Sequence, residues 1–183
     1  MLKLFPLLAL LIFSVNVKAQ KPDSVVIKKS TVKTLTDEQY TALFNGEDTY
    51  GMAKAAELNH YPLPQKALKY KKELDLSPIQ VAKLTALEKE FERKKLEMGQ
   101  TIIHNERTLD SIFKYNRVDN GSLIFYTNRY GLYQGELRNT ILQACFATKY
   151  LLTPQQVKKI WALEKVINKI PFHLFNLAAP NCV

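Results

Sequence analysis

The same five-residue pattern occurs twice in this chain, and each copy is typical of the start of an α-helix. The pattern reads leucine, serine or threonine, proline, any residue and glutamine. The hydroxyl can accept a backbone N–H that the first turn leaves unpaired, the glutamine can reach back to the cap residue, and proline sacrifices no hydrogen bond at the first helical position. The residues that define the two copies, called here the two tags, are Leu76, Ser77, Pro78 and Gln80, and Leu152, Thr153, Pro154 and Gln156.

The stretch between the tags predicts two long helices joined by one turn. Apolar residues recur at helical spacing over 78–115 and again over 122–151, with a break near 116–121. A third helix is expected after the second tag, over 154–170. At 1.5 Å per residue the first helix would be roughly 55 Å long, so much of it must be exposed or packed against a second subunit. The fold class that follows is all-α, a long antiparallel helical hairpin with short flanking helices.

The part of the chain before the first tag predicts shorter helices. Thr36 and Gln39 form a capping box that opens a short helix, and Asn45-Gly46 is typical of a helix end. Two more short helices are expected over 51–58 and 65–74, separated by a proline-containing break.

Three glycines in the middle of the long helices need a reason, because a mid-helix glycine costs about 1 kcal/mol relative to alanine. Antiparallel pairing about the turn places Gly99 close to Gly135, with Gly131 about one turn away. Either a close approach of the two helices or a bend that gives the hairpin a concave face would explain them.

The first residues predict export. Lys3 precedes an unbroken apolar run, and small residues near Ala19 offer a cleavage site before Gln20, which is typical of a cleavable signal peptide and too short for a membrane span. We therefore expect a chain in the periplasm that does not span the membrane. The expected divisions are a signal peptide over 1–19, a disordered N-terminal arm over 20–35, one helical domain over 36–170 and a C-terminal tail over 171–183.

The charge narrows the choice of partners. Loss of residues 1–19 removes Lys3 and Lys18 and no acid, so the net charge falls from +9 to +7. Export makes nucleic acid an unexpected partner. A cationic surface outside the cytoplasm is suited to anionic membrane surfaces or acidic segments of other proteins.

The sequence does not decide whether the two cysteines form a disulfide. Cys145 lies within a helical pattern and Cys182 is the second-last residue, in a compartment that permits disulfides. They could bridge if the tail folds back, and the favoured alternative is a buried thiol with a separate tail cysteine.

The sequence indicates no enzyme, cofactor or metal site. Its three histidines, His60, His104 and His173, are far apart and form no known zinc motif, and no glycine-rich phosphate loop occurs. A nucleophile with an oriented base is also missing from the pattern. Metal binding needs several ligands that converge on one point, and the expected pairing places Leu132 opposite His104.

The two tags, bracketing a long hairpin behind an export signal, resemble the paired signature of the Spy/CpxP family of periplasmic chaperones. The stretch 59–62 leading into the first tag and Glu136-Leu137-Arg138 ahead of the second extend the likeness over roughly residues 51–165. The resemblance implies a cradle-like homodimer that holds unfolded or misfolded envelope proteins without ATP, in an envelope-stress response. It also suggests the periplasmic domain of a sensor kinase as a further partner.

The same superfamily includes heavy-metal sensor and zinc-resistance proteins, which supply the alternative function. Relatives that bind metal carry histidines on these helices, whereas the corresponding inward positions here include Ile141 and Cys145. For the chaperone function, four cations on the long helices are the expected client-binding residues. They are Arg93, Lys94, Arg129 and Arg138.

Overall fold

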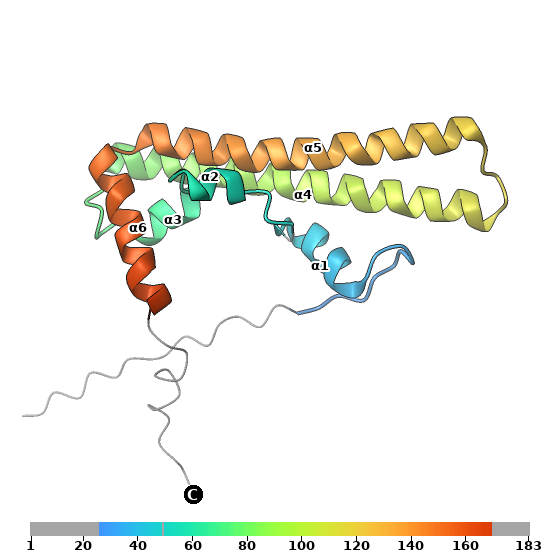
Figure 1. Cartoon of the computed structure of the whole chain (residues 1–183), viewed down its shortest axis with the longest axis horizontal. Coiled ribbons are helices and arrows are strands. Elements are labelled where there is room, and N and C mark those ends of the chain that lie inside the picture. The colour runs from blue at the N-terminus through green and yellow to red at the C-terminus, as the bar shows by residue number, and fades with distance from the viewer. Residues whose placement is uncertain (1–25, 49, 170–183) are drawn as a thin grey trace, which may run out of the picture.

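The computed structural model describes residues 26–48 and 50–169, and these residues are entirely helix, turn and loop. The predicted all-α class is therefore confirmed for this part of the chain. Two long helices lie side by side, and the shorter ones gather along one side of the pair (Figure 1). The helices are α1 (Asp37–Asn45), α2 (Lys54–Leu58), α3 (Pro64–Lys69), α4 (Pro78–Lys114), α5 (Asn120–Leu151) and α6 (Pro154–Lys169).

The helix starts follow the predicted caps. Ser77 and Gln80 form a complete capping box at the start of α4, with proline at the first helical position. Thr153 and Gln156 make the same two hydrogen bonds at α6, with distances of 3.2 Å from Gln156 N to Thr153 Oγ1 and 2.9 Å from Thr153 N to Gln156 Oε1. The capping box predicted for α1 is also present. Cap chemistry is local, which is why the sequence predicts these boundaries well.

One apolar core lies where α1 packs against α4 of the long pair. Phe91 and Ile102 of α4 and Leu137 and Ile141 of α5 are buried together with Leu43 of α1. These contacts attach the N-terminal part of the chain to the long pair and leave the far end of α4 and α5 outside this core.

A second core lies at the end of the pair where α4 begins and α5 ends. Leu84, Leu152 and Ile160 are buried there with Ala67 and Leu74. The tags meet at this core: the Gln80 side chain donates to the Leu151 carbonyl (2.9 Å), and the Gln156 side chain donates to the Leu74 carbonyl (3.2 Å). Each glutamine thus caps its own helix and holds the backbone next to the other tag.

The mid-helix glycines do not meet as expected. A Cβ on Gly99 would collide with the backbone carbonyl of Leu43, so the close approach at Gly99 is made by α1 and not by α5. A Cβ on Gly131 or Gly135 would meet nothing within 4 Å. The close-approach explanation therefore applies to Gly99 alone, with a different partner from the one expected.

Residues 26–35, the described part of the arm expected over 20–35, contact α1 and the first core. Val32 is 2 % exposed and belongs to the first core. The backbone N–H of Lys28 donates to Thr41 Oγ1 (2.8 Å) and that of Ser30 donates to Asp37 Oδ1 (2.7 Å). This polar segment is held by hydrogen bonds to α1 and one buried valine, which a composition argument does not detect. Residues 20–25, the signal peptide over 1–19 and the tail over 171–183 lie outside the described residues.

Among the described residues, no helix is both long and apolar enough to cross a bilayer.

Candidate functional site

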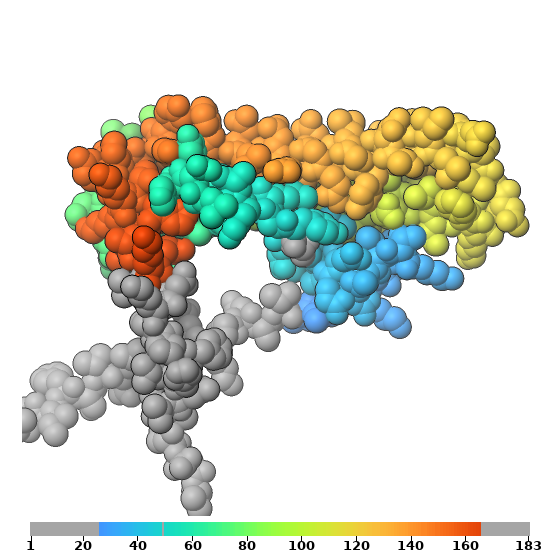
Figure 2. Space-filling model, viewed as in Figure 1, coloured from blue at the N-terminus to red at the C-terminus, as the bar shows by residue number. Residues whose placement is uncertain are grey.

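The end of the long pair farthest from α6 exposes a group of large apolar side chains. Figure 2 shows this end projecting beyond the other elements. We call this group the apolar tip. Its residues, with exposed fractions, are Phe113 (52 %), Tyr115 (57 %), Val118 (37 %), Ile124 (63 %) and Phe125 (49 %). An exposed group of this kind is typical of an interaction surface rather than of a folded core.

The turn between α4 and α5 has a defined geometry. Asn116 adopts a left-handed conformation (φ 52°) just past the end of α4, and the Arg117 N–H donates back to the Ile112 carbonyl (2.9 Å). Asp119 then caps α5 by accepting from Ser122 N (2.7 Å), and this backbone hydrogen bond lowers the pKa of Asp119. Both helix ends are thus closed by local hydrogen bonds, which fixes how the apolar side chains around them are presented.

Cations accompany the aromatic rings of the tip. Lys114 Nζ and the Arg117 guanidinium lie 5.2 and 5.7 Å from the Tyr115 ring centroid. The Arg129 guanidinium lies 4.8 Å from the Phe125 ring and donates a 2.7 Å hydrogen bond to Tyr133 Oη. None of the ion pairs found in residues 26–48 and 50–169 involves these three cations. Their charge is therefore available to an acidic partner.

The four cations predicted to bind clients do not converge. Arg93 pairs with Glu90 (2.8 Å) and Glu97 (2.9 Å), and Lys94 lies 3.7 Å from Glu90. The hydrogen bond from Arg93 lowers the pKa of Glu90 to about 2. Because carboxylates of the same helix neutralise their charges, Arg93 and Lys94 attract acidic segments less than the sequence suggests.

The other two predicted cations occupy separate places. Arg129 lies beside Phe125 of the apolar tip, as described. Arg138 lines a recess that Tyr50 and Met52 also line, alongside the loop before α2. Of the four predicted residues, the structure thus places one beside exposed apolar surface at the tip.

The described histidines do not share a site. His60 packs edge-on against Trp161, with ring centroids 5.3 Å apart, whereas His104 lines a small cleft beside Arg129 and Tyr133. No group of three histidine, cysteine or acidic side chains that could hold a metal occurs in the described part of the chain. Cys145 is fully buried, and this burial raises its pKa to about 11. Its possible partner Cys182 lies outside the described residues.

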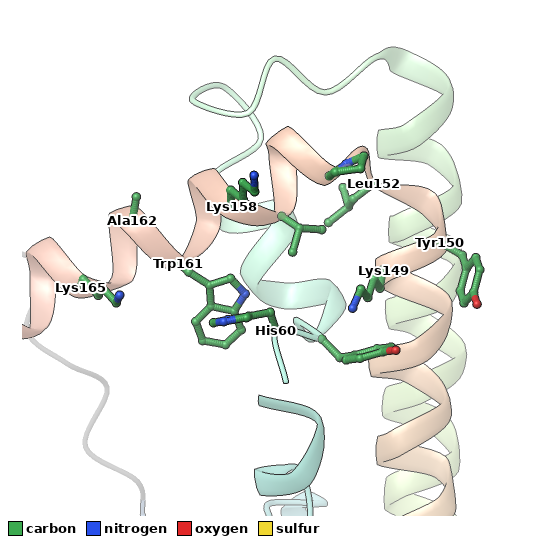
Figure 3. A pocket seen from close by; sticks show the side chains of 11 residues that line it. His60, Lys149, Tyr150, Leu152, Lys158, Trp161, Ala162 and Lys165 are labelled. Carbon is green, nitrogen blue, oxygen red and sulfur yellow. The ribbon is translucent and has the colours of Figure 1, made fainter. Parts of the chain in front are cut away.

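A cavity at the other end of the molecule was missed by the sequence reasoning. It has a volume of about 640 Å³ and lies in the angle between α5 and α6, beside the loop 59–62 (Figure 3). Its residues come from two stretches that are far apart in the sequence, 60–61 and 149–165, so periodicity within any one helix does not reveal it. A signal in the sequence is that Lys158 and Lys165 share α6 with the apolar residues Val157 and Trp161.

Comparison with known proteins gives no relative: no family model, no curated protein and no solved structure matches this chain. The resemblance to the Spy/CpxP family therefore stays a prediction from the sequence.

Proposed function

We propose that this chain is an ATP-independent chaperone that binds unfolded or misfolded proteins in the periplasm and slows their aggregation. The observation that carries the proposal is the apolar tip, in which five large apolar side chains are exposed at one end of the long pair and are accompanied by Lys114, Arg117 and Arg129.

The physical basis is the chemistry that unfolded chains share. An unfolded protein exposes apolar side chains, and burial of one such side chain contributes about 1.5–3 kcal/mol. A few of these contacts, without a shaped pocket, give binding that is weak for each contact and indifferent to sequence. Binding lowers the free concentration of the unfolded chain, which suppresses aggregation by mass action.

The cations support the same proposal. Aromatic rings with lysine or arginine over them can contact apolar segments and still attract acidic ones. The cations of the tip have no carboxylate partner among the described residues, in contrast to Arg93. We therefore assign client attraction to Arg129 and its neighbours at the tip rather than to Arg93 and Lys94.

An aggregation assay tests the proposal. The mature chain, residues 20–183, is added at equimolar concentration to a chemically denatured client as the client is diluted from denaturant, without nucleotide. We expect light scattering to fall by at least half and to depend on salt, because part of the attraction is electrostatic. Unchanged scattering at a several-fold excess of the chain contradicts the proposal.

The homodimer and the sensor-kinase partner are further parts of the proposal. A second copy could cover the apolar tip, in which case the tip would be a subunit interface. Sedimentation velocity of the wild-type chain and of an Ile124→Ser/Phe125→Ser variant separates the two roles. If the variant is still a dimer, the tip is free to bind clients. If the variant is a monomer, the tip is the subunit interface.

Capture of a purified sensor domain by the mature chain tests the second partner.

A further inference from the structure

The cavity between α5 and α6 has the size and walls of a ligand-binding site. Its volume of about 640 Å³ falls within the roughly 300–1,000 Å³ of sites for small molecules. Figure 3 shows it bounded by α6, the end of α5 and the loop 59–62. The apolar part of its lining is Tyr61, Leu152, Pro154, Val157, Trp161 and Ala162.

The charged residues of the cavity all have one sign. Lys149, Lys158 and Lys165 line it, and no acidic residue does. Lys149 Nζ lies 3.6 Å from the centroid of the Tyr61 ring, and no ion pair in the described part of the chain involves any of the three lysines.

The acidic side chains of neighbouring helices are already occupied. Glu57 of α2 and Glu164 of α6 both pair with Lys66, at 3.2 and 3.3 Å, and Glu164 also accepts from the Tyr70 hydroxyl (3.0 Å). The cavity therefore combines apolar walls with a positive charge that these acids do not neutralise.

One polar group at the cavity also lacks a partner. The Trp161 Nε1–H is buried and has no hydrogen-bond acceptor among the described residues, while its ring packs edge-on against His60. A buried N–H without an acceptor is unfavourable.

We propose that this cavity binds an anionic amphiphile, a single acyl chain with a carboxylate head group. The acyl chain would lie against the wall formed by Val157, Trp161 and Ala162, and the carboxylate would lie beside the lysines. An extended peptide fits less well, because its backbone N–H and C=O groups need partners that a mostly apolar wall does not offer. The proposal is independent of the chaperone function and of the apolar tip.

Trp161 makes the test direct, because it is the single tryptophan of the chain. Fluorescence of the mature chain is followed while dodecanoate is added below its micelle concentration. We expect a saturable change, binding that tightens roughly ten-fold for every two methylenes from octanoate to dodecanoate, and at least ten-fold weaker binding of dodecyltrimethylammonium. An equal response to the cationic amphiphile, or no dependence on chain length, overturns the proposal.

Variants locate the site. Lys149→Gln/Lys158→Gln is expected to weaken dodecanoate binding at least ten-fold, and Ala162→Phe is expected to block it by filling the cavity. The control Lys89→Gln changes an exposed lysine of α4 outside the cavity and should bind as the wild type does. Circular dichroism confirms folding. Wild-type affinity in both cavity variants contradicts the assignment, as does a Trp161 response to an acidic apolar peptide but not to dodecanoate.

Discussion

Gln80 and Gln156, 76 residues apart, hydrogen-bond to each other through their side-chain amides, with 2.9 Å from Gln80 Nε2 to Gln156 Oε1 and 3.3 Å in the reverse direction. Each amide oxygen also accepts from the N–H of its own cap residue, and each amide nitrogen also donates to a carbonyl beside the other tag. An amide side chain has two donor hydrogens and two acceptor lone pairs, so both side chains are fully satisfied. The repeated glutamine thus joins the start of α4 to the start of α6.

Loss of either glutamine should therefore cost more than loss of a helix cap. We expect Gln156→Ala to lower the free energy of unfolding by about 2 kcal/mol, because it removes the cap and leaves the Leu74 carbonyl and Gln80 with unpaired groups. Gln39→Ala is the matched control, since Gln39 makes the same capping box in α1 without a reciprocal amide partner, and it should cost no more than about 1 kcal/mol. Urea unfolding measures both changes.

A double-mutant cycle tests the coupling of the two tags. The double variant Gln80→Ala/Gln156→Ala should be more stable than the sum of the single changes implies, by about 1 kcal/mol, because each single change already breaks the shared bonds. Strict additivity would show that the two amides do not interact in solution.

Alanine substitutions at Gly99 and at Gly131 should change the stability of the fold in opposite directions. Gly99→Ala is expected to destabilise the fold by about 1–3 kcal/mol, since the added methyl group collides with the Leu43 carbonyl of α1. Gly131→Ala should stabilise it by up to about 1 kcal/mol, because its Cβ enters open space and alanine favours the helix. Thermal unfolding followed by circular dichroism measures both, and equal effects would contradict the packing of α1 on α4.

The N-terminal segment should contribute to stability through Val32. Val32→Ala is expected to cost about 2 kcal/mol of unfolding free energy, because the side chain is buried in the first core. Val26→Ala removes the same atoms from a side chain that is 77 % exposed and should change stability by less than about 0.5 kcal/mol. If the two variants unfold at the same urea concentration, residues 26–35 are the loose arm that composition predicts.

Cys145 should be chemically inert in the folded chain. Burial raises its pKa to about 11, so at pH 8 the reactive thiolate is less populated than in an ordinary cysteine by a factor on the order of a hundred. In a Cys182→Ser variant, a thiol reagent should label Cys145 quickly only after denaturant is added. Fast labelling of the native variant would contradict the burial of this thiol.

The helix starts could be predicted from the sequence because cap chemistry is local. Contacts between residues far apart in the sequence could not be predicted. The caps at Ser77, Thr153 and Thr36 need only residues three positions apart, so the boundaries of α4, α6 and α1 follow from sequence. The bonds between Gln80 and Gln156 form only when α5 brings the end of the chain back to α4. The sequence contains both glutamines but does not show that they meet.

In the candidate site too, local interactions could be predicted from the sequence and tertiary packing could not. The pairing of Arg93 with Glu90 and Glu97 is an (i, i+3) and (i, i+4) pattern, which helical spacing alone could have indicated. The exposure of Phe125 could not be read from its helix, because apolar residues occur around much of α5 and only tertiary packing decides which are covered.

The most direct test of the account compares two matched variants in the aggregation assay. Ile124→Ser/Phe125→Ser removes one isoleucine and one phenylalanine from the apolar tip, where they are 63 % and 49 % exposed. Ile79→Ser/Phe146→Ser removes the same residue types from elsewhere on α4 and α5, where they are 68 % and 50 % exposed. If the tip binds clients, the first variant loses most of its suppression of light scattering while the second keeps it. Equal suppression by the two variants, at equal folded content, would contradict the central claim.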